Sequence, residues 1–382
     1  MPASHSLGGV SRGGLSCPPR MHASLCAAGK TARRAIMGGT VAGFLAMVWL
    51  SQTACAADAP PRPPTTRPQT PASFPPGMPG SGATAPKGLM DKFDLPPKCI
   101  APDGTFDQNV IVESQKGRLA VINKELSMNL RLVETPHFLI FSMVDGPTTD
   151  AYRKSCELLY SSLCDQFIII HKERVWDGKC ILVLLQDKSG LQKFSDRVDG
   201  RKITTGPESK TEAYFVWESL RPIDKMPQLA HIVLCFEGHE PRIMRDIFAH
   251  EGTHAFVAMF RRGEPLPRWL NEGLAMYMSV VNDPPLGPLL WKDLLAKSGP
   301  DSDRILFNDK ATFLTQDEYP VAYTMVEYLC KLGGGRQNLR HFMIQLKEGK
   351  SEDAAMQTLY NIDRAKFAKQ WRKYVAGYKP AK

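Results

Sequence analysis

A short histidine motif restricts the fold of this chain more than any other sequence feature. Residues 250–254 read His-Glu-Gly-Thr-His, inside an apolar run from 243 to 260 with helical spacing. Positions four apart share one face of a helix, so the two imidazoles can converge on one metal ion, with Glu251 beside them near a metal-bound water. The segment therefore predicts a helix with two metal ligands and a general base. A pair of hydrogen-bonded helix histidines is the alternative.

A third ligand must come from elsewhere, because a catalytic zinc ion uses three protein groups and keeps its fourth position for water. One solution is a third histidine six residues after the second with glycine midway, but Phe260 and Val257 occupy those positions. Another solution takes a glutamate from the following helix, and Glu272 lies in such a segment, among large apolar residues. An unpaired carboxylate there would be costly, and metal coordination would make its burial tolerable. An exposed glutamate near a helix start is the alternative.

The two segments together resemble the gluzincin clan of metallopeptidases, whose pattern is His-Glu-x-x-His followed by Trp-Leu-x-Glu-Gly on the next helix. The resemblance implies His250, His254 and Glu272 as ligands of one Zn2+ ion per chain, and Glu251 as the general base. Seventeen residues lie between His254 and Glu272, one fewer than is usual in the aminopeptidase N family. The chain thus resembles a relative of the aminopeptidase N family rather than a member of it.

The resemblance extends to residues 319–334, which are similar to the helix that carries the transition-state tyrosine in relatives of aminopeptidase N. Tyr319 matches that tyrosine, which implies a hydrogen bond from its phenol to the developing oxyanion. A packing tyrosine is the alternative, with Tyr323 and Tyr328 nearby. The Gly-x-Met-Glu-Asn segment that captures a free amine in those enzymes is absent from residues 214–219, so aminopeptidase specificity is not predicted.

The whole arrangement looks most like the peptidase-MA-like domains of exported bacterial proteins. That likeness implies zinc-dependent hydrolysis of peptide bonds by a metal-activated water, with a peptide or protein as substrate. Two alternatives stay open: an exported non-catalytic binding or scaffold domain that retains the peptidase fold, and a zinc hydrolase of a non-peptide bond. The intact Glu251 favours catalysis, because a structural zinc site needs no base.

Residues 89–382 are predicted to form this domain, with an α+β, zincin-like fold. A strand-rich N-terminal subdomain with the active-site helix precedes a helical C-terminal subdomain. Helical spacing is found at residues 115–130, 152–167 and, with few interruptions, 241–374. Strands are predicted as a pair, or as one bent strand, at 131–144, and singly at 181–185, 214–217 and 232–236.

Residues 1–56 are predicted to be an export signal with an upstream extension. Three basic residues precede an apolar run at 35–50, which is shorter than the roughly 20 residues of a membrane-spanning helix. This signal predicts export of the protein to the periplasm, the cell surface or the medium. An uncleaved signal, or lipidation of Cys55, would tether the chain to a membrane. Residues 57–88 are rich in proline and small residues, and predict a disordered linker.

The charge distribution argues against nucleic-acid binding. The formal net charge of +9 falls to +4 without residues 1–56, since 43 basic then face 39 acidic residues. No basic run with interleaved aromatic residues occurs. Six cysteines follow the signal, and they predict either disulfides in an oxidising compartment or buried thiols.

Overall fold

The computed structural model describes most of the chain after residue 98, and the predicted signal (1–56) and linker (57–88) lie outside the described residues. The described ranges are 99–100, 104–170, 174–201, 213–219, 228–261, 263–296, 302–307, 314–315 and 317–379.

Five strands form one mixed sheet in the order β1-β2-β3-β5-β4. Their bounds are Arg131–Glu134 (β1), Phe138–Ser142 (β2), Cys180–Leu185 (β3), Ala213–Ser219 (β4) and Gln228–Cys235 (β5). The three central strands β2, β3 and β5 are parallel, whereas the edge strands β1 and β4 pair antiparallel. The predicted strands are confirmed, and residues 131–144 form the strand pair rather than one bent strand.

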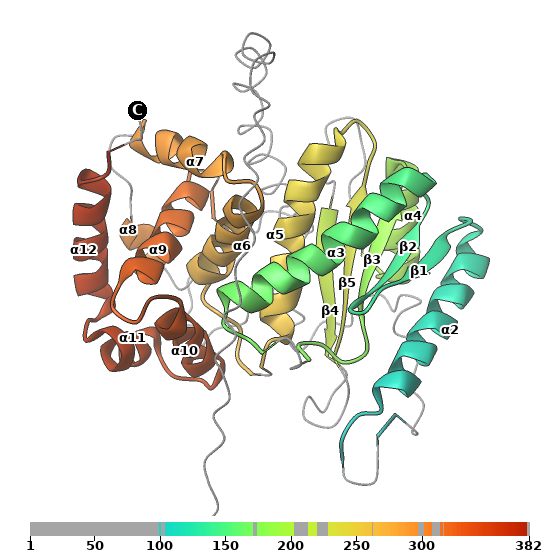
Figure 1. Ribbon diagram of the computed structural model, residues 1–382, viewed down its shortest axis with the longest axis horizontal. Helices are drawn as coiled ribbons and strands as arrows, with labels where there is room; N and C mark the ends of the chain where they lie inside the picture. The colour runs from blue at the N-terminus through green and yellow to red at the C-terminus, as the bar shows by residue number, and fades with distance from the viewer. Residues whose placement is uncertain are drawn as a thin grey trace, which may run out of the picture. The chain divides into compact units, whose positions relative to one another are not determined.

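The central strands are buried on both faces, which explains their continuous apolar sequences. On one face, Leu182 and Ile232 belong to a core shared with α3 (Gly146–Gln166) and α5 (Pro241–Met259). On the other face, Val183 and Val233 pack with α2 (Gln108–Leu126) and α4 (Lys188–Val198). Figure 1 shows α3 running across the sheet on the same side as α5. The sheet is therefore the middle of three layers.

Two of these helices differ from the prediction. Helix α2 begins well before residue 115, because the Asp107 side chain accepts hydrogen bonds from the backbone of Asn109 and Val110 and caps the helix. It ends at Leu126, because Ser127 has a left-handed backbone (φ 49°). Helix α4 was not predicted at all. Asp187 caps its first turn by accepting from the backbone N–H of Gly190.

The described residues beyond β5 are mostly helical, as predicted. Its further helices are Arg268–Asn282 (α6), Leu286–Leu295 (α7), Ser302–Phe307 (α8), Tyr319–Lys331 (α9), Gly335–Lys347 (α10), Glu352–Tyr360 (α11) and Arg364–Ala376 (α12). Helix α5 contacts β4 and β5 on one side and α6 on another, and α6 in turn packs against α9 (Figure 1). The fold is thus α+β, with α5 between the sheet and the helical half.

The contact between α6 and α9 is unusually close at Gly273. A Cβ atom added there would lie 2.5 Å from the carbonyl oxygen of Ala322 and 2.7 Å from Cγ2 of Val326. Glycine therefore lets the two backbones approach each other. This approach brings the first turn of α9 near the residue that precedes Gly273, which is Glu272.

The six cysteines that the structure describes form no disulfide with one another, and five of them are buried. The structure thus favours buried thiols over disulfides. Among the helices that the structure describes, none combines the length and the apolar character that a membrane crossing requires.

Candidate metal centre

Helix α5 carries the histidine motif in its most enclosed part. Pro241 occupies the first turn, where its missing N–H costs no helical hydrogen bond. From Ile247 to Val257 every residue of the helix is buried. The reason is the position of α5, since the sheet covers one side and α6 another. Both histidines and Glu251 are therefore held in surroundings with little water.

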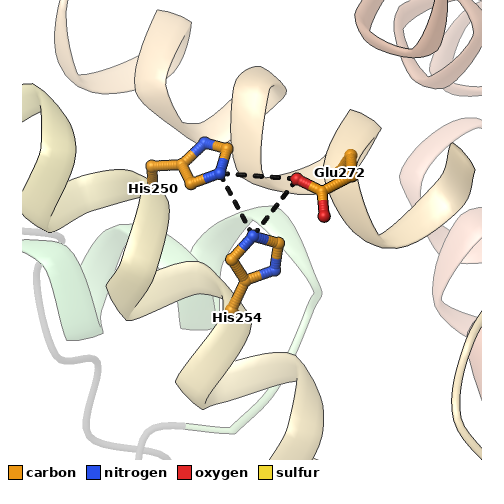
Figure 2. Close-up of side chains that lie close together, drawn as sticks. All are labelled: His250, His254 and Glu272. Carbon is orange, nitrogen blue, oxygen red and sulfur yellow. Dashed lines mark hydrogen bonds and ion pairs between the residues drawn. The ribbon is translucent and has the colours of Figure 1, made fainter. Parts of the chain in front are cut away.

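The structure brings His250, His254 and Glu272 together, as Figure 2 shows. The two Nε2 atoms are 3.1 Å apart. One carboxylate oxygen of Glu272, Oε2, lies 3.5 Å from Nε2 of His250 and 3.4 Å from Nε2 of His254. All three residues are buried. Three atoms that commonly bind metal ions thus form a small triangle between α5 and α6.

The size of this triangle fits a zinc ion. Zinc binds histidine nitrogen and carboxylate oxygen at about 2.0–2.2 Å, so two ligand atoms of a tetrahedral site lie about 3.3–3.5 Å apart. The three observed separations, 3.1, 3.4 and 3.5 Å, are close to that spacing. The donor set of two imidazoles and one carboxylate is also that of known catalytic zinc sites. The residues present therefore suit the metal that the sequence predicts.

Two of the three residues in the metal-free site, Glu272 and His250, also have the charge state that a metal ion requires. Burial raises the pKa of Glu272, but the nearby positive charges of His254 and Arg268 prevail and hold it well below the usual range. Burial lowers the pKa of His250. Burial also acts to lower the pKa of His254, but the Glu272 carboxylate overcomes this effect and raises it. The carboxylate is thus ionised and the His250 imidazole neutral, which are the forms that bind a metal ion, whereas His254, whose protonated form the carboxylate favours, must release its proton when a metal ion binds.

The two residues predicted to act in catalysis lie close to this triangle. Glu251 follows His250 on α5 and is buried. Tyr319 is the first residue of α9 and is completely buried, with its ring centroid 6.5 Å from that of His250. Within the described part of the chain, its hydroxyl group has no hydrogen-bond partner. The hydroxyl group is therefore available to a further molecule.

The phenol of Tyr319 is protonated, so it can donate a hydrogen bond. Burial raises the pKa of its phenol well above the usual value, and the negative charges of Glu272 and Glu251 add to this effect. The two neighbouring tyrosines have other surroundings. The hydroxyl group of Tyr328 contacts Gln370, and Tyr323 lies near Glu327 and Tyr277.

One residue at the site was not singled out from the sequence. Arg268, in the first turn of α6, has its Nε atom 3.3 Å from Oε1 of Glu272. The available signal was the spacing of four residues, at which arginine and glutamate side chains meet on a helix.

The edge strand of the sheet also borders the helix that carries the motif. Strand β4 pairs only with β5 in the described sheet, and α5 contacts both strands. One side of β4 therefore has no strand neighbour in the described part of the chain.

Comparison with known proteins agrees with this arrangement. Residues 231–377 match the family model of the peptidase MA superfamily. The match runs from β5 to the end of α12 and includes the three clustered residues, Glu251 and Tyr319. No curated protein matches the chain. Residues 231–377 are thus similar to the peptidase MA superfamily, which supports a metallopeptidase-like fold.

Proposed function

We propose that this chain is a zinc metallopeptidase of the gluzincin type, which hydrolyses peptide bonds. The observation that carries the proposal is the convergence of His250, His254 and Glu272 at the spacing of a tetrahedral zinc site. Zinc, when bound, polarises the scissile carbonyl group and lowers the pKa of water at the site. These three residues supply its protein ligands, one ion per chain.

Glu251 is the general base of the proposed reaction. It lies next to His250 on a helix that is buried along this stretch, so its carboxylate is within the enclosed site rather than on the surface. It accepts a proton from the attacking water and passes it to the leaving amine. A structural metal site has no use for such a group, so Glu251 supports the catalytic reading.

Tyr319 stabilises the oxyanion. Its phenol is protonated and buried, and its hydroxyl group has no partner among the described residues, so it can donate a hydrogen bond to the oxygen that becomes negative. The position of β4 supports an extended substrate, since a peptide can pair with the free side of an edge strand by main-chain hydrogen bonds. We propose export as the cellular context, on the strength of residues 1–56.

Zinc content and cleavage test the proposal together. The purified protein, Glu251→Gln and Glu272→Ala are compared for zinc per chain and for cleavage of a peptide library. Glu348→Gln, at an exposed position after α10, serves as the control. We expect about one zinc ion in the wild type, Glu251→Gln and the control, much less in Glu272→Ala, and cleavage only by the wild type and the control.

Each departure from that pattern has a clear meaning. Undiminished zinc in Glu272→Ala would refute the ligand assignment. Bound zinc in the wild type without cleavage of any peptide would refute the peptidase reading and favour a binding domain. Cleavage of an ester or a cell-wall substrate in place of peptides would favour the hydrolase of a non-peptide bond.

A separate variant tests the role of Tyr319. In Tyr319→Phe we expect kcat to fall by about 100- to 1,000-fold, the effect of removing one oxyanion donor, with unchanged zinc content. Tyr328→Phe removes a phenol from the same helix outside the site and should leave kcat unchanged. Equal kcat values in the two variants would rule out the proposed role.

A further inference from the structure

The two carboxylate oxygens of Glu272 have different surroundings. Oε2 faces the histidines, at 3.5 Å from His250 Nε2 and 3.4 Å from His254 Nε2. Oε1 faces the Nε atom of Arg268 at 3.3 Å. The metal position and the arginine therefore lie on different oxygens of one carboxylate.

A pair of this kind is more than an exposed ion pair on a helix surface. The side chain of Glu272 is only 1% exposed, whereas that of Arg268 is 33% exposed. Ion pairs on exposed helices contribute little because water screens them, but a buried carboxylate is held firmly by the groups around it. Arg268 thus reaches from the partly exposed start of α6 toward a buried ligand.

The stability of α6 does not explain an arginine at this position. Arg268 is the first residue of α6, where the helix dipole disfavours a positive charge. An arginine there opposes the dipole of its own helix. The contact of Arg268 with Glu272 explains why an arginine occupies this position, which helix stability does not explain.

We infer that Arg268 is a positioning residue, which holds Oε1 of Glu272 so that Oε2 alone faces the metal position. The inference rests on the proposed function, since it concerns the same zinc site. The printed contact of Nε with Oε1 is an ion pair at 3.3 Å rather than a hydrogen bond, so the attraction of the rigid, planar guanidinium group for that oxygen is what limits the rotation of the carboxylate. Without this contact the carboxylate is free to turn and to present both oxygens to the metal.

Metal binding in the whole protein tests the inference without any need for activity. Zinc affinity is measured by competition with a chelator for the wild type, Arg268→Met and Arg268→Lys. The loss of a positive charge would by itself tighten the binding of a cation. Weaker binding in Arg268→Met would therefore report lost orientation, and we expect a loss of about 10- to 100-fold, as for other groups that orient metal ligands. Arg268→Lys keeps the charge without the planar group, and we expect a similar loss.

The absorption spectrum of Co2+ bound in place of zinc provides a second readout. Absorption by four-coordinate Co2+ is strong, and it weakens when a further ligand atom binds. We expect weaker absorption in Arg268→Met, because both oxygens of Glu272 then reach the metal. The control is Arg364→Met, which removes a partly exposed arginine paired with Asp353 at 3.2 Å, outside the site. It should retain the affinity and spectrum of the wild type.

The outcomes separate this inference from the proposed function. Wild-type affinity and an unchanged Co2+ spectrum in Arg268→Met would overturn the inference and leave the zinc site intact. Wild-type behaviour of Arg268→Lys would overturn it as well, because charge alone would then suffice. A wild-type protein that binds neither metal would overturn the proposed function, and the inference with it.

Discussion

Replacing Gly273 with alanine should destabilise the protein by forcing α6 and α9 apart. The new Cβ atom would lie 2.5 Å from the Ala322 carbonyl oxygen, and ordinary contacts begin at 3.4 Å, so this backbone must retreat by 0.9 Å. A backbone atom cannot move away by changing a side-chain rotamer, so the loss of stability lies near the upper end of the range for overpacked cores, about 3 kcal/mol. Alanine recovers about 1 kcal/mol as the better helix former. The free energy of unfolding should therefore fall by about 2 kcal/mol in total.

Urea unfolding of the metal-free protein, followed by circular dichroism, measures this loss. With a slope of about 3 kcal/mol per M, the midpoint should fall by about 0.7 M. The control is Gly333→Ala, because a Cβ atom at Gly333 meets no atom within 4 Å. Equal midpoints for Gly273→Ala and the wild type would refute the claim that glycine is needed for this close approach. Since α9 begins with Tyr319, we also expect kcat to fall in Gly273→Ala but not in the control.

Three further predictions concern the rest of the fold. Asp199 lies 3.0 Å from His231 Nε2 and accepts a hydrogen bond from Tyr214 at 2.7 Å. Asp199→Ala should therefore lower the free energy of unfolding, measured in urea, by about 3–5 kcal/mol. An unchanged urea midpoint would contradict this prediction. Burial and the nearby Asp283 raise the pKa of Asp246 to about 7, so its contribution to stability falls as the pH rises from about 4 to 7. The gain in midpoint from Asp246→Asn should be larger at pH 8 than at pH 5, and equal gains would refute this. Alkylation of the unfolded, unreduced protein should modify each of the six described cysteines, whereas a disulfide-linked peptide pair would contradict the structure.

The parts of the site that follow from local geometry could be predicted from the sequence. Two histidines four residues apart must share a face if the segment is a helix, and the apolar run from 243 to 260 predicted that helix. Glu272 was predicted because a carboxylate among apolar residues needs a partner. The contact between Arg268 and Glu272 depends on the side-chain conformations in the folded site. Spacing alone permits that contact without requiring it.

The missed features of the fold have different causes. Helix α4 is only 11 residues long and has Gly190 near its start, but Leu191, Phe194 and Val198 recur at helical spacing and are buried against the sheet, so its local pattern could have predicted it. The start of α2 depends on a single capping side chain, Asp107. The placement of β5 between β3 and β4 follows no local pattern, because apolar strands do not reveal their neighbours.

The place of β5 in the sheet sets a limit on how the chain can be divided. The family match begins at residue 231, inside a strand that has β3 on one side and β4 on the other, and both neighbours precede the match. A fragment that began there would leave the backbone of β5 without either ladder and would expose the face of α5 that rests on the sheet. The segment that matches the family model, residues 231–377, therefore lacks strands that the folded protein needs. Expression of residues 231–377 alone should yield an insoluble or unfolded product.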